Sequence, residues 1–311
     1  MKLVSYKLKG SPGSYRIGCI TNNKVIDLQE SYRSLLISKQ ENDSIRSIEH
    51  LLPTDPNAFF SLGASAIDLA KEACEYIANH TTDNLTFDRE EVSFSTPVPA
   101  PSKIICVGKN YADHVAEMKG DVPEFPVLFA KFTNALIGPE DTIEKPILTE
   151  KLDYEAELVV VIGREASHVS RDNALNYLAG YSIGNDTSAR DLQKRTPQWL
   201  QGKTLDRSTP VGPWVVTTEE IGNPSYLAIR SSVNGEDRQA SNTSHLTFNV
   251  PFLIEFISGL ITLNPGDIIF TGTPDGVGFA MDPPQFLNDG DVVTVEIDKI
   301  GELKNRVSER K

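Results

Sequence analysis

The stretch LDYEAELVVVIG (152–163) places acidic side chains directly before a run of aliphatic residues. That run is continuously apolar and rich in β-branched residues, which is typical of a buried strand. Because residues two apart in a strand point to the same side, Glu155 and Glu157 are predicted to project together, about 7 Å apart. Asp153 joins this row if the strand begins early enough. Two anions beside a buried strand repel each other, and a bound cation would offset that repulsion.

A second acidic cluster favours the interpretation that these carboxylates bind a cation. The stretch YSIGNDTSARDLQ (181–193) ends a predicted strand with Asn185 and Asp186. From such a position a carboxylate can turn into a pocket, although turn formation or helix capping also explains an aspartate there. Taken without this cluster, Glu155 and Glu157 fit equally well an exposed acidic edge, or glutamates paired with Arg or Lys from a neighbouring strand. Oxygen ligands of this kind suit Mg²⁺, Mn²⁺ or Ca²⁺ rather than Zn²⁺.

A histidine and a carboxylate lie three residues apart in GKNYADHVAEM (108–118). If this stretch is helical, His114 and Glu117 are neighbours on one face. A carboxylate beside an imidazole raises its basicity and fixes its tautomer, which is the arrangement needed to activate water. Such pairs also occur on solvated helices, so the spacing alone indicates the chemistry only weakly.

The chain around these motifs predicts an α+β fold that is mainly β. From Ile104 onward, short β-branched runs alternate with turns marked by Gly and Pro, as in a sandwich or barrel. The first hundred residues combine short strands with helical patterns at 44–52 and 64–80. The proline-rich segment 95–103 reads as a connector. We therefore predict a small N-terminal α+β domain over residues 1–97 and a second domain over 98–311.

Two helices are predicted inside the second domain. One covers 171–180, with Gly180 as its C-terminal stop, and the other covers 250–260, with Pro251 in its first turn. The loops 115–126 and 194–201 are expected to border any substrate pocket. Trp199 could border the pocket beside Lys203, but packing in the core is the favoured prediction.

Composition limits the partners of this 311-residue chain. Its formal charge of −13 repels polyanions and no basic patch interrupts it, so no nucleic-acid partner is expected. No apolar run approaches the roughly 18 residues of a membrane helix, and the N-terminus has no signal-peptide pattern. Cys19, Cys74 and Cys106 are widely spaced and are predicted to be reduced thiols. A cytoplasmic location is expected, with the mitochondrion as the alternative.

Seven segments occur in a fixed order along the chain: GKNYADHVAEM, PVLFAKFTNALIGP, LDYEAELVVVIG, GNDTSARDLQ, QGKTLDRSTPVGPW, VNGEDRQASNTSHL and NPGDIIFTGTPDGVG. In this order they resemble the fumarylacetoacetate hydrolase family, over about Lys103 to Val307. The first hundred residues, with PPQFLNDGDVV (283–293), look most like the longer fumarylacetoacetate hydrolase domain-containing proteins. The resemblance implies a mixed-sheet, barrel-like catalytic domain and a homodimer.

The resemblance also implies roles for individual residues. The metal ligands would be Glu155, Glu157 and Asp186, with Mg²⁺ as the expected ion and Mn²⁺ or Ca²⁺ as alternatives. The implied catalytic residues are Lys203, beside the metal, and the dyad His114 and Glu117 on a mobile lid. The implied substrate-binding residues are Arg190, Gln193 and Thr273.

This constellation predicts an enzyme acting on 2-oxo or β-diketo carboxylic acids through an enolate that the cation stabilises. Hydrolysis of a C–C bond in an acylpyruvate-type substrate is the first prediction, because a His–Glu dyad is suited to activating water. The alternatives are keto–enol tautomerisation of oxaloacetate, and decarboxylation or isomerisation of 2-oxo diacids. A non-catalytic, metal-dependent binding protein is a further alternative, although it would need no water-activating pair.

Overall fold

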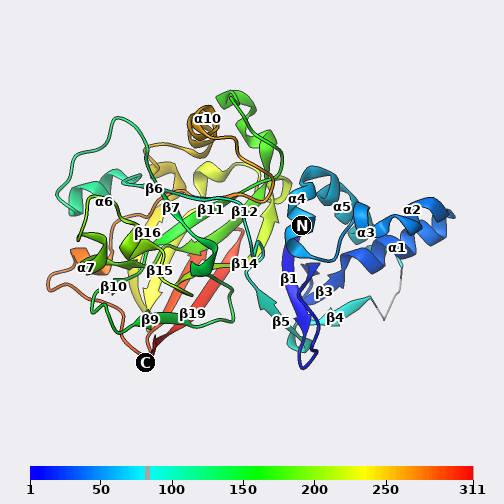
Figure 1. The fold of residues 1–311 in the computed structure, drawn as a ribbon, viewed down its shortest axis with the longest axis horizontal. Helices are drawn as coiled ribbons and strands as arrows, with labels where there is room; N and C mark the ends of the chain where they lie inside the picture. Colours follow the sequence, from blue (N-terminus) through cyan, green and yellow to red (C-terminus); the bar gives the residue numbers. More distant parts are fainter. Residues whose placement is uncertain (81–84, 311) are drawn as a thin grey trace.

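The computed structural model describes residues 1–80 and 85–310, whose strands form a twelve-stranded mixed sheet, a five-stranded sheet and a two-stranded ribbon (Figure 1). The large sheet has the order β4-β3-β2-β1-β14-β12-β11-β17-β6-β7, with β5 beside β1 and β8 beside β14. The second sheet has the order β16-β15-β18-β19-β9, and β10 pairs with β13 in the ribbon. The predicted α+β class is confirmed, with open mixed sheets.

The strands have the following bounds. Those of the N-terminal part are β1 (Lys2–Leu8), β2 (Arg16–Thr21), β3 (Lys24–Asp27), β4 (Thr86–Asp88) and β5 (Val92–Ser95). The other strands of the large sheet are β6 (Ile104–Gly108), β7 (Val127–Lys131), β8 (Leu136–Ile137), β11 (Ala156–Ile162), β12 (Leu178–Asn185), β14 (Thr209–Thr217) and β17 (Ile268–Phe270). The remaining strands are β9 (Ile143–Pro146), β10 (Leu152–Asp153), β13 (Ser188–Ala189), β15 (Ala228–Val233), β16 (Glu236–Asn242), β18 (Val292–Ile297) and β19 (Gly301–Arg310).

Half of the described α-helices lie at the N-terminal end of the molecule. They are α1 (Leu28–Lys39), α2 (Asn42–Arg46), α3 (Ile48–Leu51), α4 (Pro56–Leu62) and α5 (Ala64–Ala78). The later helices are α6 (Ala112–Glu117), α7 (Arg190–Gln193), α8 (Leu200–Lys203), α9 (Thr218–Ile221) and α10 (Val250–Leu260). Among the described helices, none has both the length and the apolar character needed to cross a bilayer.

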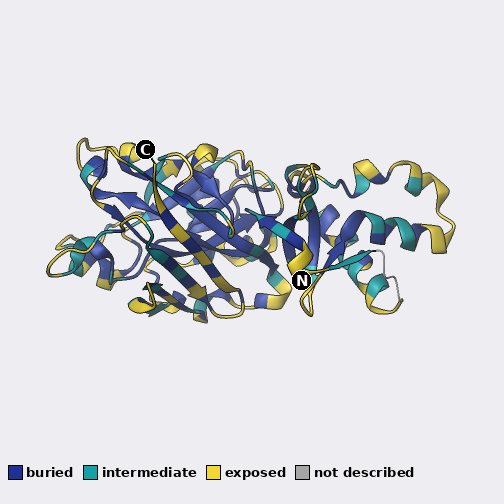
Figure 2. Cartoon of the chain, turned by 90° about the horizontal axis from the view of Figure 1, so that it is seen from below, coloured by how far each residue is buried: buried dark blue, intermediate teal, exposed yellow. Residues whose placement is uncertain are grey.

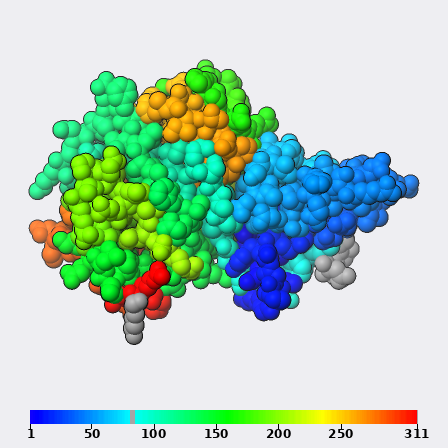
Figure 3. Space-filling model, in the orientation of Figure 1, coloured from blue at the N-terminus to red at the C-terminus, as the bar shows by residue number. Residues whose placement is uncertain are grey.

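The first hundred residues share the large sheet with the rest of the chain. Strand β1 pairs with β14 through Lys2 opposite Val216, and the Ala64 N–H donates to the Gly163 carbonyl at 2.9 Å. Figure 3 shows the N-terminal helices projecting from the larger body of the molecule. The boundary between residues 97 and 98 stays a prediction, because the sheet runs continuously through both units.

The predicted helix over 171–180 is wrong at its C-terminal end. Residues Arg171–Tyr177 form a 3₁₀ helix, and β12 begins at Leu178, so Gly180 lies inside a strand. A Cβ on Gly180 would lie 2.1 Å from the Val216 carbonyl oxygen of β14. The glycine therefore allows a close approach of two strands and does not end a helix.

Two further helical patterns were incompletely predicted. The pattern at 44–52 forms two short helices, α2 and α3, and α1 was not predicted because its apolar spacing is weak. The helix expected at 250–260 is confirmed, with Pro251 in its first turn. Cys19, Cys74 and Cys106 are free thiols, as predicted.

Buried side chains follow the strands of the large sheet, whereas exposed ones gather on loops and on the outer faces of the N-terminal helices (Figure 2). One hydrophobic cluster joins both parts of the chain, since it contains Phe59 and Phe60 of α4 together with Val159 of β11 and Phe270 of β17. All seven residues of β11 are buried, which fits its continuous apolar run. This packing holds the ends of β11 and β12 in one place, and the candidate site is built there.

Candidate active site

The β11–β12 pairing brings the three predicted metal ligands together. Ala156 lies opposite Asn185, and Asp186, immediately after β12, donates its N–H to the Glu155 carbonyl at 2.9 Å. One carboxylate oxygen each from Glu155, Glu157 and Asp186 lies within 4.8 Å of the other two, and all three side chains are buried. The expectation that Glu155 and Glu157 project to the same side is met.

The donor set fits a hard divalent cation. Three buried carboxylates offer only oxygen atoms, which is the chemistry of Mg²⁺, Mn²⁺ and Ca²⁺ sites. Burial, together with the nearby charges of Asp186 and Glu155, raises the pKa of Glu157 well above its ordinary value. A cation bound between the three carboxylates would offset the repulsion among them.

Two buried lysines pair with these carboxylates. The Lys203 Nζ lies 2.6 Å from Glu155 Oε2 and 2.6 Å from Asp186 Oδ2. The Lys131 Nζ lies 2.5 Å from Asp186 Oδ1 and donates to the Thr187 carbonyl at 3.2 Å. Sequence reasoning missed Lys131, although a charged residue ending the apolar strand PVLFAK was an available signal.

These ion pairs shift the pKa values of Glu155 and Lys203. Burial would raise the pKa of Glu155, but the charges of Lys203 and Arg190 hold that pKa below its usual range. Burial would lower the pKa of Lys203, but Asp186 and Glu155 raise it overall. Glu155 and Lys203 are therefore both ionised, and Lys203 is a fixed positive charge at the edge of the site.

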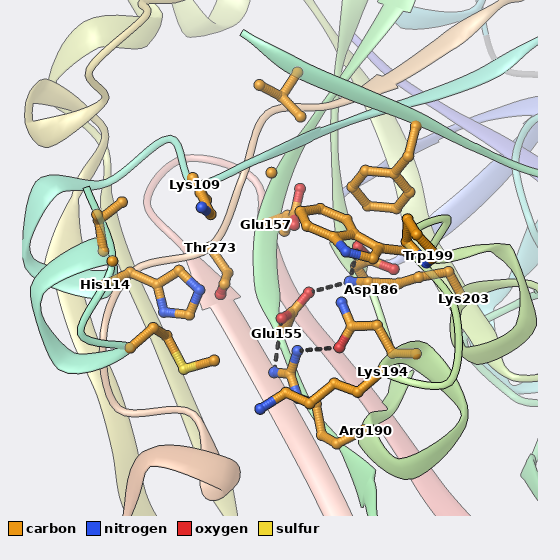
Figure 4. Close-up of a pocket in the computed structure, with 18 of the residues that line it drawn as sticks. Lys109, His114, Glu155, Glu157, Asp186, Arg190, Lys194, Trp199, Lys203 and Thr273 are labelled. Carbon is orange, nitrogen blue, oxygen red and sulfur yellow. Dashed lines mark hydrogen bonds and ion pairs between the residues drawn. The ribbon is translucent and has the colours of Figure 1, made fainter. Parts of the chain in front are cut away.

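The Arg190 guanidinium is bonded to protein acceptors through all three of its nitrogens. Its Nε donates to Asp153 Oδ2 at 2.8 Å, its Nη2 to Glu155 Oε1 at 2.7 Å and its Nη1 to Gln193 Oε1 at 3.2 Å. Figure 4 shows Arg190 and Lys203 converging on Glu155 from one side of the pocket. Asp153 lies in the short strand β10 and pairs with Arg190; it is not one of the three clustered carboxylates.

The predicted dyad is formed on α6. His114 Nδ1 lies 2.7 Å from Glu117 Oε1, and the Gly276 N–H donates to Glu117 Oε2 at 2.9 Å. Because Nδ1 is held by Glu117, Nε2 is the nitrogen left to face a ligand. Figure 4 shows His114 across the pocket from Lys203 and Trp199. The dyad and the carboxylates therefore face one space from opposite sides.

That space is a cavity of about 400 Å³. Its lining includes eight of the nine predicted site residues: His114, Glu155, Glu157, Asp186, Arg190, Gln193, Lys203 and Thr273. The ninth residue, Glu117, does not line the cavity but is hydrogen-bonded to His114, which does. Gln239 Nε2 donates to Thr273 Oγ1 at 2.7 Å, which fixes the threonine side chain. The geometry brings the predicted residues together, and their individual roles stay predictions.

Trp199 lies in the wall of this cavity, so the expectation that it packs in the core is wrong. Its ring packs edge-on against Phe129 at a centroid distance of 5.3 Å. A Cβ on Gly108 would lie 2.5 Å from the indole, so the glycine at the end of β6 makes room for it. Residues from both expected border loops line the cavity, including Val115 and Pro197.

Comparison with known proteins decides the family. A profile of the family described as fumarylacetoacetate (FAA) hydrolase C-terminal matches residues 103–308. The chain belongs to the fumarylacetoacetate hydrolase family. The resemblance identified from the sequence is thereby confirmed, and the chain is an enzyme of this family.

Named relatives extend the match over the whole chain. The fumarylacetoacetate hydrolase domain-containing protein 2 homolog of Dictyostelium discoideum is 41% identical over 318 residues, covering 99% of this chain and 97% of the relative. Oxaloacetate tautomerase fahd2, mitochondrial, of Xenopus laevis is 38% identical over 309 residues, covering 99% and 90%. The predicted likeness to the longer members is therefore confirmed.

A solved structure supports the fold and the metal chemistry of the family. The maleylpyruvate hydrolase from Sphingobium sp. SYK-6, in complex with manganese(II) ion and pyruvate, aligns with a TM-score of 0.75 at 27% identity, covering 100% of both chains. That relative thus holds a divalent metal together with pyruvate, a 2-oxo acid. In this chain, the buried acidic triad is the group that could hold such an ion.

Proposed function

We propose that this protein is a divalent-metal-dependent tautomerase that interconverts the keto and enol forms of oxaloacetate. The observation that carries the proposal is the His114–Glu117 dyad facing three clustered carboxylates, in a chain aligned over nearly its whole length with a named oxaloacetate tautomerase. This was the alternative in the sequence analysis, and the relatives support it better than C–C hydrolysis.

The residues present fit the implied ion. Glu155, Glu157 and Asp186 would hold Mg²⁺, with Mn²⁺ or Ca²⁺ as alternatives. When bound, the cation supplies Lewis-acid stabilisation of negative charge that develops on a substrate oxygen. Lys203, ionised at the edge of the same cluster, adds a second positive charge beside that oxygen.

The dyad provides the proton-transfer group. In the keto-to-enol direction, His114 Nε2 takes a proton from the carbon between the carbonyl and the distal carboxylate. The Glu117 carboxylate, 2.7 Å from Nδ1, stabilises the imidazolium that results. The proton then passes to the substrate oxygen, so the reaction is an isomerisation that consumes no water. In the reverse direction the same nitrogen protonates the carbon.

The test is a stopped-flow absorbance measurement of freshly dissolved enol-oxaloacetate with enzyme and Mg²⁺. We expect loss of the enol faster than the buffer-catalysed rate, and a return to that rate with a chelator. A proton NMR time course on the same mixture separates the keto product from pyruvate, which would indicate decarboxylation. Unchanged enol decay with metal present would contradict the proposal.

Hydrolysis of an acylpyruvate is the second candidate. The apolar wall formed by Phe129 and Trp199 favours it, because a four-carbon diacid has no apolar group to place there. In that reaction the dyad would deprotonate a water aimed at the second carbonyl. Acetylpyruvate with Mg²⁺ is the test substrate, and appearance of acetate and pyruvate in the NMR spectrum would establish hydrolysis.

The homodimer and the cytoplasmic location also stay proposals, with the mitochondrion as the alternative location. Light scattering of the purified chain tests the first, and fractionation of the source cells tests the second. A small-molecule 2-oxo acid is the expected partner in either case.

A further inference from the structure

We infer that Asp153 is a positioning residue that couples Glu155, one of the proposed metal ligands, to Glu117 on α6, the proposed lid. The inference rests on the proposed metal site, but not on which reaction the site performs. Asp153 is fully buried, lies outside the cavity lining and does not belong to the carboxylate cluster. Its carboxylate nevertheless accepts four N–H bonds, from the Arg190 side chain and from the backbone of Tyr154, Gly278 and Phe279.

The first arm of the coupling runs through Arg190 to a metal ligand. Asp153 Oδ2 accepts the Arg190 Nε–H at 2.8 Å, and Arg190 Nη2 donates to Glu155 Oε1 at 2.7 Å. The planar guanidinium is rigid, so the orientation of Asp153 sets the orientation of Glu155. Arg190 is 3% exposed and has no solvent-facing alternative for these bonds.

The second arm runs through the loop that follows β17. Gly278 and Phe279 donate their N–H groups to Asp153 at 2.8 and 3.1 Å. Two residues before Gly278, the Gly276 N–H donates to Glu117 Oε2 at 2.9 Å and so holds the lid carboxylate. Tyr154, adjacent to Asp153, donates its hydroxyl to the Gly276 carbonyl at 3.1 Å.

The loop that donates to Asp153 packs closely against neighbouring backbone at its glycines. Gly276 has a φ of +94°, and a Cβ there would lie 2.2 Å from the Arg238 carbonyl oxygen. A Cβ on Gly278 would lie 1.9 Å from the Gln285 carbonyl oxygen. A shift of the Asp153 carboxylate therefore displaces the amide that holds Glu117, and with it the position of His114.

The test is Asp153→Asn in the full chain. The amide keeps the size of the side chain but presents an NH₂ group to the Arg190 Nε–H or to a backbone N–H, so one donor loses its acceptor. We expect Mn²⁺ affinity, measured by calorimetry, to fall by about 10- to 100-fold, as for changes behind metal ligands in other sites. Hydrogen exchange of the lid, measured by mass spectrometry over Ala112–Glu117, should become faster.

Two further variants test the two arms of the coupling one at a time. Tyr154→Phe removes only the bond to the Gly276 carbonyl, so lid exchange should accelerate while Mn²⁺ affinity stays unchanged. Arg190→Lys keeps the charge but cannot bridge Asp153 and Glu155, so Mn²⁺ affinity should fall while lid exchange stays unchanged. These two variants carry the test if Asp153→Asn does not fold.

Asp267→Asn is the matched control, because Asp267 is also fully buried, accepts backbone N–H groups and does not line the cavity. It should change neither quantity. Equal effects in Asp267→Asn and Asp153→Asn, or no effect in Asp153→Asn, would overturn the coupling. Failure of the unmodified protein to bind Mn²⁺ would instead contradict the proposed metal site.

Discussion

At the scale of single residues, His114 should matter for proton transfer and not for metal binding. It faces the carboxylates across the cavity but is not one of the clustered ligands. His114→Ala should lower kcat by about 10²- to 10⁴-fold, the range for loss of a general acid–base group. Mn²⁺ affinity measured by calorimetry should stay within twofold of that of the unmodified protein. Retained turnover in this variant would show that another group moves the proton.

Glu157 should have opposite effects on metal binding and on the stability of the metal-free protein. Glu157→Gln removes one of the three proposed ligands, so Mn²⁺ binding should weaken by at least tenfold. The same change removes a buried charge whose pKa is raised by burial and by Asp186 and Glu155. In the presence of a chelator, the variant should therefore be as stable as the unmodified protein or more stable.

Thermal unfolding with chelator and with Mn²⁺ checks this prediction. The exposed Glu236→Gln serves as the control and should change neither curve. If the Glu157→Gln variant is less stable than the unmodified protein without metal, then protein groups alone compensate the negative charge of Glu157.

At the scale of secondary-structure elements, α7 depends on a carboxylate whose contribution varies with pH. Asp191 Oδ1 accepts the Thr149 hydroxyl at 2.6 Å, and Oδ2 accepts the Glu150 N–H at 3.3 Å. Burial alone would raise the pKa of Asp191, but these hydrogen bonds lower it overall. A folded-state pKa below the unfolded value adds stability above about pH 3.8, and this stability is lost as pH falls through the folded pKa.

Asp191→Asn should therefore reduce the free energy of unfolding by about 1 kcal/mol at pH 7, the contribution of a hydrogen bond to a partly exposed group. The difference from the unmodified protein should shrink as pH falls below 3.8. Urea unfolding at a series of pH values measures this. A difference that is constant with pH would show that the charge of Asp191 contributes nothing.

At the scale of the whole molecule, the N-terminal part and the catalytic part should unfold as one unit. Phe60 is fully buried in the hydrophobic cluster that also contains Phe270, and a Cβ on Gly266 would lie 3.4 Å from the Phe60 Cβ. Phe60→Ala should cost about 3–5 kcal/mol. Trp199 and Trp214 are the two tryptophans of the chain, and both lie beyond residue 98.

Urea unfolding followed by Trp199 fluorescence in a Trp214→Phe background tests whether the two parts unfold together, because Trp199 lies in the cavity wall whereas Trp214 packs against the N-terminal strands. We expect Phe60→Ala to shift a single transition, with no change for Tyr226→Ala, whose residue is 71% exposed. An unshifted fluorescence transition in Phe60→Ala would indicate that the two parts unfold separately.

The sequence alone was sufficient to predict the α+β class and the family, because short motifs in a fixed order encode them. The two-residue period of a strand predicted that Glu155 and Glu157 project together, and the three-residue spacing on a helix predicted that His114 and Glu117 are neighbours. The nine candidate site residues and their roles came from the family resemblance, and eight of the nine line one cavity.

Only the tertiary structure decided the surroundings of those residues. It placed Lys131 against Asp186, directed Asp153 to Arg190 and set Gly180 inside a strand against β14. It also moved Trp199 from the expected core to the cavity wall. Each of these depends on contacts between segments distant in the chain, and a buried charge or a glycine does not specify its partner until the strands are paired. Sequence motifs thus predicted which residues belong to the candidate site, and the packing of distant segments decided what each of those residues contacts.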